Sequence, residues 1–114
     1  MILNEDEIIH IITRRRYADD VRRHFVGRVI EATDVSARVE GYAFVFDSNR
    51  NEYVKREHMR MRIIALADAG NIINVLPRSV ELDDLKYAMS DRGKLVVTDG
   101  RSFSLDINEC GANR

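Results

Sequence analysis

GYAFVFDSNRNEYV, residues 41–54, is the stretch of this 114-residue chain that decides its expected fold. It completes an alternating β-branched and aromatic run that begins near Val35, passes through a polar tip from Asp47 to Asn51, and then becomes apolar again. Alternation with a period of two is typical of a strand, and a polar tip between apolar runs indicates a turn. Because a glycine inside a strand commonly marks a bend or bulge, we expect the strand to bend at Gly41.

The two faces of this long strand carry different residues. One face keeps small and β-branched residues throughout, namely Val35, Ala37, Val39, Gly41, Ala43 and Val45. The other face begins with charge and ends with aromatic rings, namely Arg38, Glu40, Tyr42, Phe44 and Phe46. The strand is therefore expected to start half-exposed and to become buried on both faces, as in a single sheet that curls into a small barrel.

Further strands are expected on both sides of this one. Residues 25–33 (FVGRVIEAT) are separated from it by a short turn at Thr33-Asp34, which predicts an antiparallel hairpin. Residues 59–67 (MRMRIIALA) and 72–77 (IINVLP) predict two strands joined by a tight turn at DAGN. Residues 94–107 predict a closing hairpin with Asp99-Gly100 as a type I′ turn.

Two helices are expected to flank the strands. From Asn4 to about His24, a capping box formed by Asn4 and Glu7 precedes an apolar stripe at Ile8, Ile11, Ile12, Ala18, Val21 and Phe25. Its Arg-rich part, residues 13–23, is interpreted as a solvated face, with a nucleic-acid or partner surface as the alternative. After Pro77, Ser79 can cap a second helix that presents Leu82, Leu85 and Met89 at helical spacing.

The expected fold class is therefore mainly β with flanking helices. It consists of an N-terminal helix, a strongly bent five-stranded antiparallel barrel, and then a C-terminal helix and β-hairpin. Residues 1–114 are expected to form a single domain, in which residues 5–76 make the helix and barrel and residues 77–109 a helix-hairpin extension. The length is within the usual range for one domain that buries its own core.

Composition excludes several classes of protein. The formal net charge is -1, although Arg14 to Arg28 holds six arginines against two aspartates, and Arg50 to Arg62 holds five basic residues against two glutamates. Polyelectrolyte binders usually show a larger excess of positive charge. The single cysteine, Cys110, cannot form an intramolecular disulfide, and no apolar run approaches the roughly 20 residues that span a bilayer. A cytoplasmic location is expected.

The opening stretch resembles the first sequence motif of the Sm/LSm family. That motif places a glycine, an apolar residue, an aspartate, an asparagine and further apolar residues at fixed spacing, and Gly41, Ala43, Asp47, Asn51 and Tyr53-Val54 match it. DAGNIINVL, residues 68–76, is similar to the second motif, with Gly70 and Asn71 in place. The resemblance covers residues 5–76 and implies the bent, Sm-like barrel.

The resemblance also implies a candidate RNA site. In RNA-binding members a base stacks on the residue two after the aspartate, is read by the asparagine, and is held by an arginine in the second turn. Here those positions are Asn49, Asn51 and Ala69, so only Asn51 matches in full, and the adjacent Arg50 could stack in place of Asn49. The candidate RNA-binding residues are Asp47, Asn49, Arg50, Asn51, Gly70 and Asn71.

Two other functional classes fit the sequence less well. ATDVSARVEG, residues 32–41, is reminiscent of PilZ domains, but Gly41 lies two residues late and no two arginines of the N-terminal cluster are four apart. Catalysis is not expected, because His10, His24, His58 and Cys110 show no metal-ligand spacing, and no phosphate loop or nucleophile motif is present. No cofactor and no metal are expected.

Two functional hypotheses follow. The first is a non-catalytic, Sm-like interaction or scaffold protein that forms homo-oligomers through its barrel edge strands and binds a protein partner. The alternative is an RNA-binding, Sm-like ring with altered base specificity. The extension after Pro77 could cover a face of the ring or block the edge that closes it.

Overall fold

Nine β-strands form two antiparallel sheets in the computed structural model, which describes residues 2–68 and 70–107. The first sheet contains β1 (Ile8–Thr13), β2 (Arg23–Ala32), β3 (Ser36–Asp47), β4 (Glu52–Lys55), β5 (Arg60–Ala65) and β6 (Asn71–Leu76). The second contains β7 (Lys86–Met89), β8 (Leu95–Thr98) and β9 (Ser104–Asp106), preceded by the 3-10 helix η1 (Leu82–Asp84). The predictions for Ala69, for Cys110 and for the C-terminal tail lie outside the described residues.

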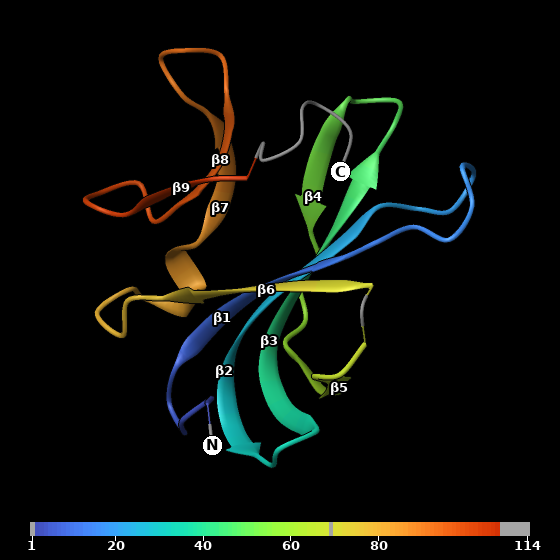
Figure 1. Ribbon diagram of the computed structural model, residues 1–114. Helices are drawn as coiled ribbons and strands as arrows, with labels where there is room; N and C mark the ends of the chain where they lie inside the picture. Colours follow the sequence, from blue (N-terminus) through green and yellow to red (C-terminus); the bar gives the residue numbers. More distant parts are fainter. Residues whose placement is uncertain (1, 69, 108–114) are drawn as a thin grey trace.

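The first sheet is built around the long strand β3 (Figure 1). Its strand order is β4-β3-β2-β1-β6, and β5 pairs with β3 as well. β3 therefore has two successive partners along one edge, because residues 36–41 pair with β5 and residues 44–47 pair with β4. At the opposite end of the sheet, β1 pairs with β6 over its whole length.

Two glycines allow β2 and β3 to bend sharply together. Gly27 and Gly41 face each other in the β2–β3 register, and a Cβ atom on Gly41 would lie 1.9 Å from the carbonyl oxygen of Val26. No side chain fits at that distance, so only glycine permits this approach of the two backbones. Gly41 is also the last residue that pairs with β5. The bend expected at Gly41 thus lies where β3 changes its partner.

The first sheet is buried on both faces. On the inside of its curl, Ile64 of β5 and Ile73 of β6 pack against one cluster with residues of β1 to β3, so the two ends of the sheet approach each other. We call this the concave core; its buried members are Leu3, Ile9, Ile11, Phe25, Val29, Ala32, Ala37, Val39 and Ala43. The alternating faces predicted for β3 are confirmed here, because Ala37, Val39 and Ala43 point into this core and Phe44 points to the other side.

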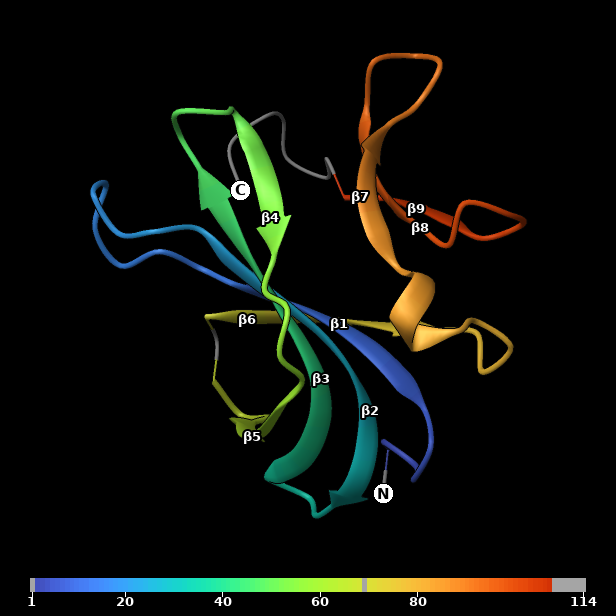
Figure 2. The same cartoon turned by 180° about the vertical axis from the view of Figure 1, so that it is seen from behind.

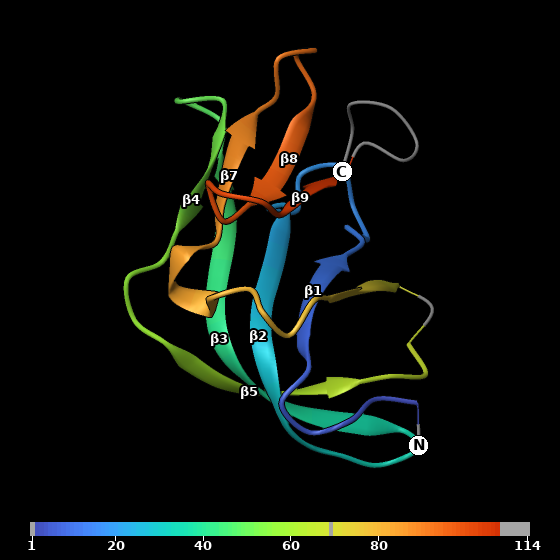
Figure 3. The same ribbon diagram turned by 90° about the vertical axis from the view of Figure 1, so that its left-hand side faces the viewer.

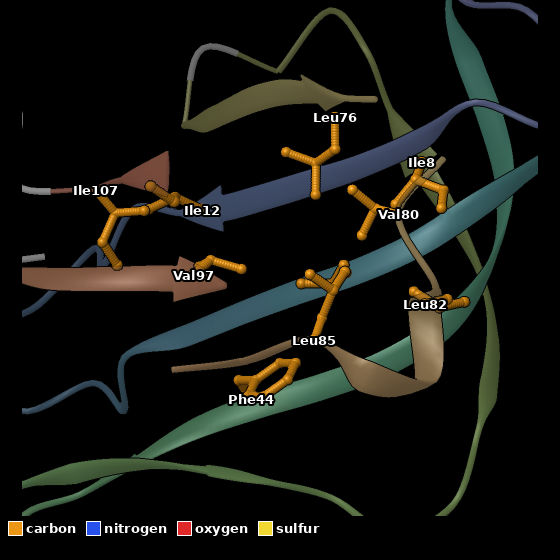
Figure 4. Close-up of a cluster of buried hydrophobic side chains, with 10 residues drawn as sticks. Ile8, Ile12, Phe44, Leu76, Val80, Leu82, Leu85, Val97 and Ile107 are labelled. Carbon is orange, nitrogen blue, oxygen red and sulfur yellow. The ribbon is translucent and has the colours of Figure 1, made fainter. Parts of the chain in front are cut away.

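The second sheet covers the outside of the curl. Figure 3 shows β7, β8 and β9 in front of β2 and β3, and Figure 2 shows the second sheet from the side, next to the first. Figure 4 shows the apolar side chains that meet between the two sheets. We call this cluster the inter-sheet core; its buried members are Ile8, Ile12, Val26, Phe44, Leu76, Val80, Leu82, Leu85, Val97 and Ile107. The described chain after Pro77, residues 78–107, therefore covers a face of the first sheet and does not pair with the outer edges of β5 and β6.

The predicted N-terminal helix is wrong. Residues 8–13 form β1, and residues 14–22 form the loop that connects it to β2. Within β1, Ile9 and Ile11 enter the concave core while Ile8 and Ile12 enter the inter-sheet core. A strand buried on both faces has a continuous apolar run, and such a run also fits a helical stripe.

The predicted C-terminal helix is also wrong. Leu82 and Leu85 are buried through one 3-10 turn, the chain then continues as β7, and Met89 is 65% exposed. The predicted hairpin after it is present as β8 and β9. Its turn is not type I′, because Thr98 pairs with Ser104 across a longer loop in which Gly100, but not Asp99, has a positive φ.

The predicted five-stranded, Sm-like barrel with flanking helices is thus corrected to two packed sheets of six and three strands. β5 and β6 do not pair with each other within the described residues, so the first sheet curls without closing. The one helical segment of residues 2–68 and 70–107 spans three residues, far too few to cross a bilayer.

Candidate functional site

A cavity lies between the tips of two hairpins, one from each sheet. It has a volume of about 490 Å³ and is bounded by the β3–β4 end of the first sheet and by β7, β8 and their turn in the second. Phe46, Tyr53 and Tyr87 give it aromatic walls, while Arg22 and Asn51 supply polar groups. Ligand sites are commonly clefts of this size with apolar walls and a few polar groups, so this cleft is the candidate site.

A chain of hydrogen bonds runs beside the cleft, between the two sheets. Nδ2 of Asn74 donates to Nδ1 of His10 at 3.2 Å, which places the proton of neutral His10 on Nε2. Nε2 then donates to the hydroxyl of Tyr87 at 2.8 Å, and that hydroxyl shares a second hydrogen bond with Nδ1 of His24 at 2.5 Å. β1, β2, β6 and β7 each contribute one of these residues, so the chain ties the second sheet to the first.

Burial sets the protonation of these groups. It lowers the pKa of His10 from 6.5 to about 4, because the charged imidazolium is poorly solvated there. Burial also holds the pKa of Tyr87 well above 10, with a smaller contribution from Tyr53. His10 and Tyr87 are therefore neutral at physiological pH, which is the state that the hydrogen-bond chain requires.

Stacked aromatic rings connect this chain to the cleft wall. Tyr53 stacks on His24 with ring centroids 4.5 Å apart and on Tyr87 with centroids 4.9 Å apart. Phe46 meets Tyr53 edge-on at 5.3 Å. Offset stacks and edge-on contacts of this kind are favourable ring arrangements, and they fix the shape of the wall.

The charged residues at the cleft differ in whether they have an ion-pair partner. The guanidinium of Arg22 lies over the ring of Phe46, 5.1 Å from its centroid, and no carboxylate of the described residues is within ion-pair distance of it. Glu52, which also lines the cleft, lies 3.8 Å from Arg50, and Arg50 lies 3.8 Å from Asp47 as well. Arg22 therefore differs from Glu52 in that it lines the cleft without an ion pair among the described residues.

The 47–51 turn from the sequence prediction borders this cleft, but most of its polar groups serve the turn itself. Oδ1 of Asp47 accepts hydrogen bonds from the backbone N–H groups of Asn49 and Arg50 at 2.9 and 3.4 Å. Arg50 also lies 3.8 Å from Asp47 and from Glu52. Asn51 adopts a left-handed conformation, with φ of 53°, and it alone of the predicted site residues lines the cleft.

Asn71 begins β6 at the same end of the sheet, and Gly70 lies in the turn before it. Asn71 is in register with Thr13, which is in register with Arg23, and Arg23 with Val45 near the end of β3. Three strand spacings of about 4.8 Å, or about 14 Å along the sheet, therefore separate Asn71 from Val45, which precedes the 47–51 turn. Nδ2 of Asn71 donates to the carbonyl of Ala65, and Gly70 N–H donates to Asp68. Among the predicted residues, Gly70 and Asn71 thus lie apart from the 47–51 turn.

Sequence reasoning missed His10, His24, Tyr53 and Tyr87. The two histidines were interpreted as scattered, because a single sequence gave no sign that residues 8–13 and 23–28 are paired strands. Their one signal is that His10 shares the alternating face of Ile8 and Ile12. Tyr87 had no signal at all, because the segment that contains it was interpreted as helical.

Comparison of the chain with protein-family models, with curated proteins and with solved structures gives no match. The Sm/LSm resemblance therefore stays a prediction. Within the described residues, no three His, Cys, Asp or Glu side chains gather so that they could hold a metal ion. The fold and the cleft define a two-sheet β-domain with a candidate binding site between its sheets.

Proposed function

We propose that this protein is a non-catalytic interaction module that associates with further copies of itself through the outer edges of β5 and β6. The observation that carries the proposal is that, within the described residues, neither edge has a strand partner. An unpaired edge presents a row of backbone N–H and C=O groups that another strand can pair with.

The side chains at these edges support the same proposal. On β5, Met61 and Ile63 are 48% and 66% exposed, and on β6, Val75 is 54% exposed. Residues 71–76 of β6 contain no charged side chain, although edge charges are a common protection against unwanted pairing. Apolar side chains on an open edge are stabilised when a second chain covers them.

The geometry of association is a further consequence. If β5 of one copy pairs with β6 of the next, the two surfaces differ, and the contact is heterologous. Heterologous contacts either close into a ring or continue as a filament. The second sheet packs on a face of the first and leaves both edges accessible.

Size-exclusion chromatography with light scattering tests the proposal. The wild-type chain is expected to elute as an oligomer, while Ile63→Lys and Val75→Glu place charge on the edges and shift it to a monomer. Val35→Lys is the matched control, because Val35 is 63% exposed but lies in the β2–β3 turn. A monomeric wild type, or equal dissociation by the control, would contradict the proposal.

A second candidate function, RNA binding, is favoured by the loop between β1 and β2. Arg14, Arg15, Arg16 and Arg23 line a hollow of about 280 Å³ there, and Figure 1 shows this loop on the same side as the turn between β3 and β4. Fluorescence anisotropy with a single-stranded RNA at low and high salt tests it. Tight, salt-sensitive binding that Arg15→Ala and Asn51→Ala each weaken would favour this candidate over the first.

A further inference from the structure

The cleft between the two hairpin tips has walls that suit a flat ring. Tyr53 stacks on both His24 and Tyr87, and Phe46 adds an edge-on ring to this aromatic cluster. From the second sheet, Met89 is exposed and Leu95 is half-buried at the same cleft. Aromatic rings and a thioether are the surfaces against which planar apolar groups pack best.

The position of Arg22 adds a charge preference. Its planar guanidinium rests on Phe46 and is half-buried, so its orientation is restricted before any ligand arrives. Arginine N–H groups match the oxygens of phosphate and carboxylate in a two-pronged geometry. Arg22 makes no ion pair within the described residues, so its N–H groups are available to an anion at the cleft.

We propose that this cleft is a binding site for a small aromatic anion, a molecule in which a flat ring carries one phosphate or carboxylate group. The ring packs against Tyr53 and Met89, and the anionic group pairs with Arg22 at the rim. The volume of about 490 Å³ accommodates a ligand larger than one ring. This site is separate from the β5 and β6 edges, so it can exist whether or not the chain associates.

The test is an NMR titration of the ¹⁵N-labelled full chain with phenyl phosphate, using phenol and inorganic phosphate as partial probes. A probe of this size is expected to bind with a Kd of about 1 mM, because each of its few atoms contributes little. Amide shifts are expected at residues 51–53 and 87–89. Phenol and inorganic phosphate are each expected to bind at least about fivefold more weakly, because each lacks one half of the contacts.

Variants separate the two halves of the site. Arg22→Gln is expected to weaken phenyl phosphate binding about tenfold, and Tyr53→Leu about fivefold, while Tyr53→Phe keeps the ring and the affinity. Arg78→Gln, which removes an exposed arginine outside the cleft, is the matched control and should change the affinity less than about twofold. If Arg22→Gln does not give a folded spectrum, Arg22→Lys replaces it. Arg22→Lys is expected to bind phenyl phosphate more weakly than wild type and Arg78→Gln do, but still detectably.

Four results would overturn the proposal. They are an absence of shifts at 10-fold the expected Kd, shifts confined to the loop between β1 and β2, equal affinity for phenol, and an unchanged affinity in Arg22→Gln. Shifts at the cleft that depend on both Arg22 and the ring of Tyr53 would support it.

Discussion

The two faces of β1 enter two cores of different character. Ile9 and Ile11 point into the concave core, whose buried members are all apolar, whereas His10 lies on the face that meets the second sheet. There the hydrogen-bond chain through Tyr87 lies beside the apolar side chains. The concave core is shaped by close backbone approach at two glycines, and the inter-sheet core is positioned by directional polar contacts. Substitutions in the two cores should therefore lower the stability of the fold for different physical reasons.

The largest effect is expected for Gly41→Ala. The new Cβ atom would lie 1.9 Å from a backbone oxygen of Val26 and 2.4 Å from the Cα of Gly27, so β2 and β3 would have to separate. We expect a loss of at least about 4 kcal/mol in the free energy of unfolding, measured by urea denaturation. Gly70→Ala is the control, because its Cβ would meet only the side chain of Asp68, at 3.1 Å. Equal losses in both variants would show that the close approach is not decisive.

Acid should weaken the inter-sheet core through His10. Its pKa is 6.5 when unfolded and about 4 when folded, so the unfolded chain binds more protons between these values. The stability linked to His10 is therefore complete above about pH 6.5 and is lost as the pH falls towards 4, by up to about 3 kcal/mol.

Denaturation midpoints between pH 4.5 and 7.5 measure this dependence. His24, Asn74 and Tyr87 are the polar groups that face His10, and none of them is a carboxylate. His10→Gln should flatten the dependence, whereas His58→Gln, at an exposed histidine, should leave it as in wild type. A slope that survives in His10→Gln would assign it to another group.

A smaller loss is expected for Tyr87→Phe, which keeps the stacked ring and removes only the hydroxyl. That hydroxyl bonds to both His10 and His24, so its removal breaks two buried hydrogen bonds. We expect a loss of about 2 kcal/mol in thermal or urea unfolding. Tyr42→Phe removes an exposed hydroxyl that donates to Asp83, and it should cost less than about 1 kcal/mol. Equal costs would mean that the polar chain adds nothing beyond an ordinary surface contact.

The smallest effect is expected at the 47–51 turn, outside both cores. Asp47→Ala removes the acceptor for two backbone N–H groups of the turn and should cost about 1 kcal/mol. Asp34→Ala, in the turn between β2 and β3, is the control, because the described residues make no side-chain hydrogen bond to it. A cost that does not exceed that of the control would leave Asp47 available for another role.

The sequence predicted the strands that alternate and missed those buried on both faces. β3 could be predicted because its faces differ, and β5 and β6 because a turn separates two β-branched runs. β1 could not, because both of its faces are covered and the resulting apolar run has no period of two. The second face is covered by a sheet whose first strand, β7, was itself interpreted as helical from the spacing of Leu82, Leu85 and Met89.

Most residues of the candidate site could not be predicted either, because the packing of the second sheet on the first was not predicted. Asn51 was found from a motif that lies within one hairpin, and local patterns are what a single sequence records well. Tyr87 and Arg22 reach the cleft from segments far apart in the chain, and that placement depends on how the second sheet docks. The turn predicted from the polar tip at residues 47–51 is present, and Asp47 bonds the backbone amides of that turn.

The pairing of β1 with β6 also limits the order in which the strands can pair during synthesis of the chain. β1, β2 and β3 follow one another in the chain and can pair as soon as they are synthesised, but the pairing of β1 with β6 must wait until β6 has emerged. Contacts between such distant segments slow folding, because a long loop must close before they form. During translation, the isoleucine-rich β1 therefore lacks β6, its second strand neighbour. A chaperone that shields residues 8–13 would have its largest effect before β6 leaves the ribosome.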